Sequence, residues 1–159
     1  MNDEREQVIT KLRELCNGNT DATNFLLNLW SFICVWDDAI DQDKPADEAQ
    51  INAAMMWALF GMHESAFYIK HDNILRTMLM HYVSSWLTAN KFEKSGDRDL
   101  IEQAYFMRCA FYDVVSTVAF LCGGFSHQMA AMEYCRALAP NDTLESYMKE
   151  HFHGMAEQS

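Results

Sequence analysis

The sequence predicts an all-α protein, a single-domain bundle of about seven helices over residues 1–159. Apolar residues recur at spacings of three and four almost throughout the chain, whereas strand-like alternation is scarce. Half of the residues are hydrophobic and 13% are aromatic, with only six glycines and two prolines, a composition that favours a packed helical core. A length of 159 residues is that of one ordinary domain.

Residues that start or stop helices divide the first half of the chain. The expected ranges of the first four helices are about 3–16, 21 or 23 to 41, 48–70 and 73–92. Asn17-Gly18 ends the first helix, and the loop 42–45 follows the second. Asp47 is expected to cap the third helix, and Asp72, directly after His71, to cap the fourth.

The second half contains three further expected helices, at about 97–123, 126–138 and 143–151. The polar segment Glu93–Gly96 separates the fourth helix from the fifth. Gly123-Gly124 permits the left-handed turn that ends the fifth, and Pro140 closes the sixth. A short polar tail begins at about residue 152.

Charge is the strongest deviation in composition. Twelve Lys and Arg against twenty-three Asp and Glu leave a formal net charge of −11. Such a surface repels nucleic acid and anionic membranes, so neither is an expected partner. Acidic charge suits a divalent metal ion or a basic protein partner, or it simply keeps an apolar chain soluble.

The five cysteines are odd in number, widely spaced and without a CxxC pair, which argues against a zinc site and against a disulfide framework. A reducing compartment is therefore expected. The start MNDEREQ has no apolar core behind it, and polar residues interrupt every long apolar stretch within a membrane-spanning length. We expect a cytoplasmic location.

Two of the predicted helices, the third and the fifth, are apolar nearly all round, as in Met55–Phe60 and Val114–Leu121. Such helices belong inside a bundle or at an interface between subunits. The chain also holds eleven methionines, ten phenylalanines, six tyrosines and four tryptophans, which is more bulk than one small core readily hides. A homodimer is expected.

An acidic run, Asp37-Asp38-Ala39-Ile40-Asp41, stands at the predicted end of the second helix. At about 100° per residue, Leu26, Trp30 and Ile33 form one apolar stripe of this helix. Asp37 and Asp41 continue that stripe, and Asp38 lies at its edge. Carboxylates there are costly unless paired or bound to a cation, and a helix C-terminus disfavours them further. Three interpretations stay open: a divalent cation such as Mg²⁺, an ion pair with Arg108, and a solvated helix end.

The run resembles the DDxxD motif of the isoprenoid (terpene) synthases, an all-α family that uses it to hold Mg²⁺ against a substrate diphosphate. The resemblance implies that Asp37, Asp38 and Asp41 are metal ligands and that the bundle is a reduced version of that fold. The family's second metal motif is matched in part, since Asp113 and Thr117 fit it but Leu121 stands in place of the glutamate. The resemblance covers two helices.

Two functions follow as hypotheses. The first is a Mg²⁺-dependent enzyme acting on a diphosphate-containing small molecule, with Asp37 and Asp41 at the reaction centre and Arg108 contacting the anionic substrate. Asp38, Asp113 and Thr117 complete the expected metal ligands. The second is a non-catalytic, small acidic interaction protein, of viral or mobile-element origin, that binds a basic protein partner. The sequence has no ExxH pair, GxSxG elbow, phosphate loop or basic stripe to suggest another chemistry.

Overall fold

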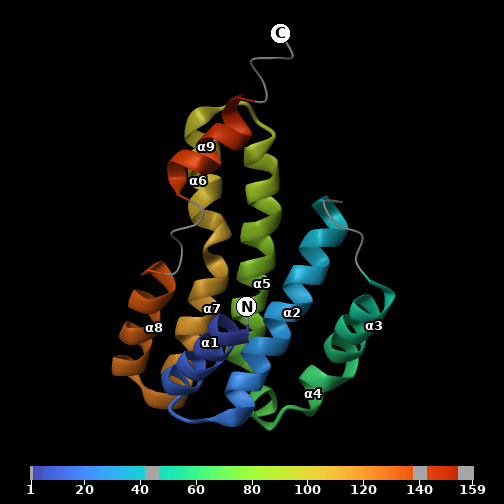
Figure 1. Cartoon of the computed structure of the whole chain (residues 1–159), viewed down its shortest axis with the longest axis vertical. Coiled ribbons are helices and arrows are strands. Elements are labelled where there is room, and N and C mark those ends of the chain that lie inside the picture. The colour runs from blue at the N-terminus through green and yellow to red at the C-terminus, as the bar shows by residue number, and fades with distance from the viewer. Residues whose placement is uncertain (1, 42–46, 138–142, 154–159) are drawn as a thin grey trace. The chain divides into compact units, whose positions relative to one another are not determined.

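The fold is all-α, as the sequence predicted. The computed structural model describes residues 2–41, 47–137 and 143–153, and no β-strand occurs in these ranges. Figure 1 shows the helices in chain order. The predicted loop 42–45, Pro140 and the tail beyond residue 153 lie outside the described residues.

The helices agree in number with the prediction when continuous stretches are counted. Their bounds are α1 Asn2–Leu15, α2 Thr20–Asp41, α3 Glu48–Met56, a π-helical segment η1 Trp57–Gly61, α4 Met62–Glu64, α5 Ala66–Glu93, α6 Arg98–Arg108, α7 Ala110–Gly123, α8 Phe125–Ala137 and α9 Leu144–His153. The backbone stays helical from α3 through η1 into α4, and Cys109 alone separates α6 from α7. Seven continuous stretches therefore make up the described part of the chain.

Contacts between Cα atoms divide the chain into two compact units, Met1–Asn73 and Ile74–Ser159. Each unit is described by itself below. The expectation of one domain over residues 1–159 concerns cooperative folding and stays a prediction.

In the first unit, the core is built around Phe25 of α2, which is almost fully buried. Its ring centroid lies 6.1 Å from that of Trp57, 6.2 Å from that of Phe67 and 5.8 Å from that of Tyr68. Aromatic rings at these separations attract one another beyond the effect of burial alone. This cluster fastens η1 and the start of α5 to α2.

The predicted junction at His71-Asp72 is present as a kink at His71 (φ −121°, ψ 19°), where two helices join within α5. A further break, which was not predicted, occurs earlier, at Ser65 (φ −66°, ψ 119°). The Ser65 hydroxyl accepts the backbone N–H of Tyr68 at 3.2 Å, and the Asp21 carboxylate accepts that of Phe67 at 2.5 Å. Ser65 Oγ also donates to Asp21 at 3.2 Å. Two side chains thus satisfy the first N–H groups of α5.

In the second unit, α7 and α8 pack as a hairpin around a glycine turn (Figure 1). Gly124 has φ +75°, a conformation that glycine adopts without strain. Gly123 is required for a different reason, since a Cβ there would lie 2.3 Å from ring atoms of His127. The His127 ring in turn hydrogen-bonds the Gly123 carbonyl, with 3.0 Å between Nδ1 and the oxygen. The predicted end of the fifth helix at this glycine pair is confirmed.

A second cluster joins α5, α6 and α9. Its buried members are Ala89, Ile101, Ala104 and Tyr147. The Asp97 side chain caps α6 by accepting the backbone N–H groups of residues 99 and 100, at 2.9 and 3.2 Å. This packing brings the C-terminal helix against the end of α5 and the beginning of α6.

The stretch Arg98–Gly123, formed by α6 and α7, is long and apolar enough to cross a membrane, and it is the one such helix in the described ranges. It also contains Arg108 and Asp113 and supplies buried residues such as Val114 and Val118. Core helices of globular proteins commonly reach the same length and hydropathy. The stretch therefore gives little support to a membrane location.

Candidate functional site

A groove of about 790 Å³ lies on the first unit, along α2. Four of the residues that α2 contributes to its lining recur at spacings of four, three and four, and we call them the floor of the groove: Leu27, Ser31, Cys34 and Asp38. Residues with these spacings share one face of an α-helix. The floor is thus a single stripe of α2 that ends at a carboxylate.

The walls of the groove are mainly apolar. Val8 and Ile9 of α1 form part of the lining, and α3 and η1 contribute Ala53, Ala54 and Trp57. The Trp57 ring packs against other aromatic rings, since its centroid lies 6.1 Å from those of both Phe25 and Phe32. Among the described residues, no lysine or arginine lines the groove. Asp38 therefore gives the groove a negative end without a compensating cation in its lining.

The thiol of Cys34 responds to that negative charge. Burial raises the pKa of Cys34, and the charges of Asp38 and Asp37 raise it further. Burial is the larger cause, and because negative groups disfavour a thiolate, the remaining part of the shift reflects a negative electrostatic potential in the groove. That potential favours the binding of a cation.

The predicted acidic run is only partly described. Asp37 and Asp38 are both half-buried, and the backbone of α2 continues to Asp41, but the Asp41 side chain lies outside the described residues. Trp30, expected on the buried stripe, is 50% exposed. Leu26 and Ile33, the other members of that stripe, are buried as predicted, together with Phe25 and Leu29. Asp38, expected at the edge of the stripe, lines the groove.

No group of three or more His, Cys, Asp or Glu side chains that could hold a metal ion occurs among the described residues. Because the Asp41 side chain lies outside the described residues, the three-aspartate site stays a prediction. The structure brings together Asp37 and Asp38, which are neighbours on α2.

Asp113 and Thr117, the other predicted metal ligands, lie one turn apart on α7 in the second unit. The Thr117 hydroxyl donates to the backbone carbonyl of Asp113 at 2.8 Å, and Ser116 donates to the same oxygen at 3.0 Å. Such bonds back to the preceding turn are common for Ser and Thr inside helices. Thr117 thus has a local structural role.

Arg108 lies in an ion pair within the second unit. Its Nε and Nη2 atoms each donate to Glu93 at 2.8 Å, and Nη2 donates also to Asn90 at 2.5 Å. The guanidinium carbon stands 5.1 Å from the centre of the Trp86 ring. Two parallel hydrogen bonds are the strong geometry of an Arg–carboxylate pair. The predicted partners of Arg108 were an anionic substrate or Asp37 and Asp41; its partner in the second unit is Glu93.

Glu93 is more enclosed than Arg108, with 9% of its side chain exposed against 23%. Burial by itself would raise the pKa of Glu93, but hydrogen bonds from Arg108 and Tyr147 and the charges of Arg108 and His151 outweigh it. The pKa of Glu93 therefore lies below its usual value. Burial and the bond to Glu93 also raise the pKa of Tyr147, which keeps its hydroxyl protonated as a donor.

The partners of Arg108 were not predicted from the sequence, because Glu93 belongs to the segment Glu93–Gly96, which was interpreted as a loop. Tyr147, which donates to the same carboxylate, is 54 residues further along the chain. The groove was missed as well, although the four-three-four spacing from Leu27 to Asp38 is visible in the sequence. The signal in the sequence was a stripe of uncharged residues on one helical face that ends in an aspartate.

No protein-family model, curated protein or solved structure matches the chain in sequence or structure comparisons.

Proposed function

We propose that the protein is a non-catalytic binding protein whose first unit holds a basic amphipathic helix of a protein partner. The observation that carries the proposal is the groove along α2, which has apolar walls and a carboxylate, Asp38, at one end. An amphipathic helix binds such a groove through its apolar face. Its basic residues would lie toward Asp38.

The length of the groove suits a short helix. Leu27 and Asp38 are eleven residues apart on α2, which corresponds to about 16 Å along the helix axis. About three turns of a partner helix cover the same distance. Apolar side chains spaced three and four apart on the partner would meet Trp30, Phe32 and Trp57.

Charge supports a basic partner over an anionic one. The formal net charge of −11 attracts a positively charged protein at long range and repels an anionic one. At short range, Asp37 and Asp38 already act together on the Cys34 thiol. A lysine or arginine placed beside Asp37 and Asp38 would be attracted to both carboxylates.

The test uses a synthetic amphipathic helix of leucine and lysine, with its binding measured by calorimetry. The variant Ser31→Trp fills the floor of the groove, because Ser31 is exposed there. Ser84→Trp is the matched control, since Ser84 is an exposed helical serine of α5 outside the groove lining. A second peptide with glutamate in place of lysine tests the charge preference.

Binding of the lysine peptide to the wild type and to Ser84→Trp, with loss in Ser31→Trp, is the expected result. Asp38→Asn should weaken binding by about two- to fivefold, as for a partly exposed charge pair. Equal binding of the two peptides, or full binding by Ser31→Trp, would refute the proposal.

The second candidate function is Mg²⁺-dependent chemistry on a diphosphate, with Asp37, Asp38 and Asp41 as ligands. It is supported by the charge of Asp38 in the lining of an apolar groove and by that of its neighbour Asp37, which acts with it on Cys34. Mg²⁺ commonly binds through one or two carboxylates and completes its shell with water and phosphate. In this scheme the apolar walls hold the non-phosphate part of the substrate.

Calorimetry with Mg²⁺ and pyrophosphate distinguishes the second function from the first. The second function predicts that Mg²⁺ and pyrophosphate bind to the wild type and that binding is lost in Asp37→Asn/Asp41→Asn. Asp99→Asn is the control variant, since Asp99 is an exposed acid on α6. Absence of Mg²⁺ binding to the wild type would exclude it. For either function we propose a cytoplasmic location, which is supported by five free cysteines.

A further inference from the structure

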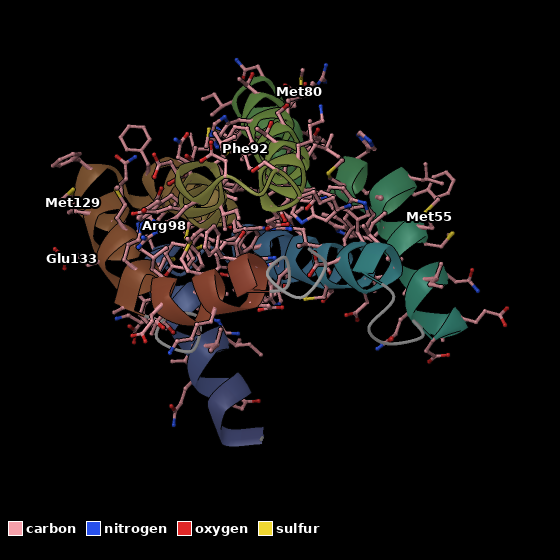
Figure 2. The ribbon with its side chains drawn as sticks, turned by 90° about the horizontal axis from the view of Figure 1, so that it is seen from above. Met55, Met80, Phe92, Arg98, Met129 and Glu133 are labelled. Carbon is pink, nitrogen blue, oxygen red and sulfur yellow. The ribbon has the colours of Figure 1, made fainter. Side chains whose placement is uncertain are left out.

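The side of α3 and η1 that faces away from α2 is a continuous apolar surface. Its side chains are between 40% and 59% exposed, and we call it the α3–η1 face: Ile51, Met55, Met56, Leu59 and Phe60. Figure 2 shows Met55 pointing outward from α3. No residue of α3 is buried, which is unusual for so apolar a helix.

The α3–η1 face is held on a firm base. Trp57, in the same continuous helix, has its ring centroid 6.1 Å from those of both Phe25 and Phe32 of α2. The helix also widens into a π-helical segment over Trp57–Gly61, and such segments occur frequently at functional sites. The outer residues are therefore displayed by a helix whose inner side is fixed.

A shallow hollow of about 530 Å³ lies within this face, lined by Met56, Trp57, Phe60, Gly61 and Glu64. Gly61 helps to keep it open, because a Cβ there would lie only 3.1 Å from the Trp57 ring. A hollow beside protruding apolar side chains can accept a side chain from another helix.

The exposed area approaches what an association of two proteins requires. Taking each of the five side chains as about 200 Å² when fully exposed, the α3–η1 face presents roughly 500 Å² of apolar surface. A patch of this size lies at the upper end of those on monomeric proteins, and a standard interface buries about 800 Å² on each partner. The polar residues around the face supply the remainder.

The distribution of charge favours a second copy of the chain as the partner of the α3–η1 face. Residues 49–63 contain no Asp, Glu, Lys or Arg, although the whole chain carries a net charge of −11. Two copies of the chain repel each other least where this uncharged segment meets itself. Acids occur only at the two ends of the α3–η1 face, Glu48 and Glu64.

We propose that the α3–η1 face binds a second copy of the chain, with α3 and η1 of the two copies packed against each other about a twofold axis. Side chains such as Phe60 enter the hollow of the other copy. Trp57 lines both the hollow and the α2 groove, so the two sites adjoin on this helix.

Analytical ultracentrifugation of the full chain tests the proposal. A wild-type species of twice the 18.4 kDa chain mass is expected at micromolar concentration. Met56→Glu and Phe60→Glu should each weaken dimerisation by about tenfold or more, because they place a carboxylate in an apolar contact. Met80→Glu and Phe125→Glu are matched controls, at positions exposed by 66% and 69%, and should leave the dimer intact.

Far-UV circular dichroism, which reports helix content, accompanies each variant so that dissociation is distinguished from unfolding. A wild type that is monomeric at these concentrations would overturn the proposal. So would a dimer that both α3–η1 variants, in folded form, leave unaffected.

Discussion

Asp38 and Cys34 lie one helical turn apart on the floor of the α2 groove, and the carboxylate raises the pKa of the thiol after burial has already raised it. Cys34 is thus a native probe of the charge in the groove. Whatever neutralises Asp38, a mutation, a metal ion or a basic side chain, should change the reactivity of this one thiol.

The first prediction concerns the variant Asp38→Asn, which should lower the pKa of Cys34. The physical reason is the loss of a negative charge that disfavours the thiolate. The measurement is the pH dependence of alkylation at Cys34, followed by peptide mass spectrometry. Cys109, half-buried on the second unit, is the internal control. An unchanged Cys34 profile would mean that Asp38 does not set the potential of the groove.

The ion pair of Arg108 and Glu93 gives the second prediction. Glu93→Gln should lower the free energy of unfolding by about 2–4 kcal/mol, because it leaves a largely enclosed guanidinium without its carboxylate. Urea unfolding measures the loss. Glu145→Gln is the matched control, since Glu145 pairs with Lys149 at 2.7 Å on the surface, and it should leave stability nearly unchanged. Similar losses in both variants would contradict a special role for the enclosed pair.

The third prediction is the pH dependence of that stabilisation. The pKa of Glu93 is lowered in the folded protein, so the unfolded state binds its proton first as pH falls. The difference in unfolding free energy between wild type and Glu93→Gln should be fully present above the ordinary glutamate pKa. It should shrink as pH falls through the lowered value. A difference that stays constant through this acid range would show that the carboxylate charge contributes nothing.

The fourth prediction concerns the α7–α8 turn. Gly123→Ala should destabilise the protein by about 1–3 kcal/mol, because the new Cβ meets the His127 ring at 2.3 Å. Thermal unfolding measures the effect. Gly123→Ala combined with His127→Ala should be less destabilised than the sum of the two single changes, since the clash is then absent. Strict additivity would indicate that the ring moves aside freely.

Local signals in the sequence predicted much of the fold. The cap Asp47 was predicted because an N-cap side chain bonds to N–H groups only two or three residues away. The end of the fifth helix at Gly123-Gly124 is local in the same sense. The all-α class followed from apolar spacing over the whole chain.

Features that depend on distant residues were not predicted. The break at Ser65 relies on Asp21, which is 44 residues earlier in the chain. The burial of Glu93 relies on Arg108 and Tyr147, which lie beyond the loop that follows it. Trp30 was placed on the buried stripe because a helical wheel gives the spacing of residues but not which neighbouring helices cover them. The metal-binding role of the acidic run stays a prediction.

The most direct test of the central claim, that the groove binds a basic amphipathic helix, is the alkylation rate of Cys34 in the presence of a saturating leucine–lysine peptide. The thiol lies on the floor of the groove, so an occupied groove should slow its reaction strongly while the rate at Cys109 stays the same. The Ser31→Trp variant should show no peptide effect. A Cys34 rate that the bound peptide leaves unchanged would contradict the account.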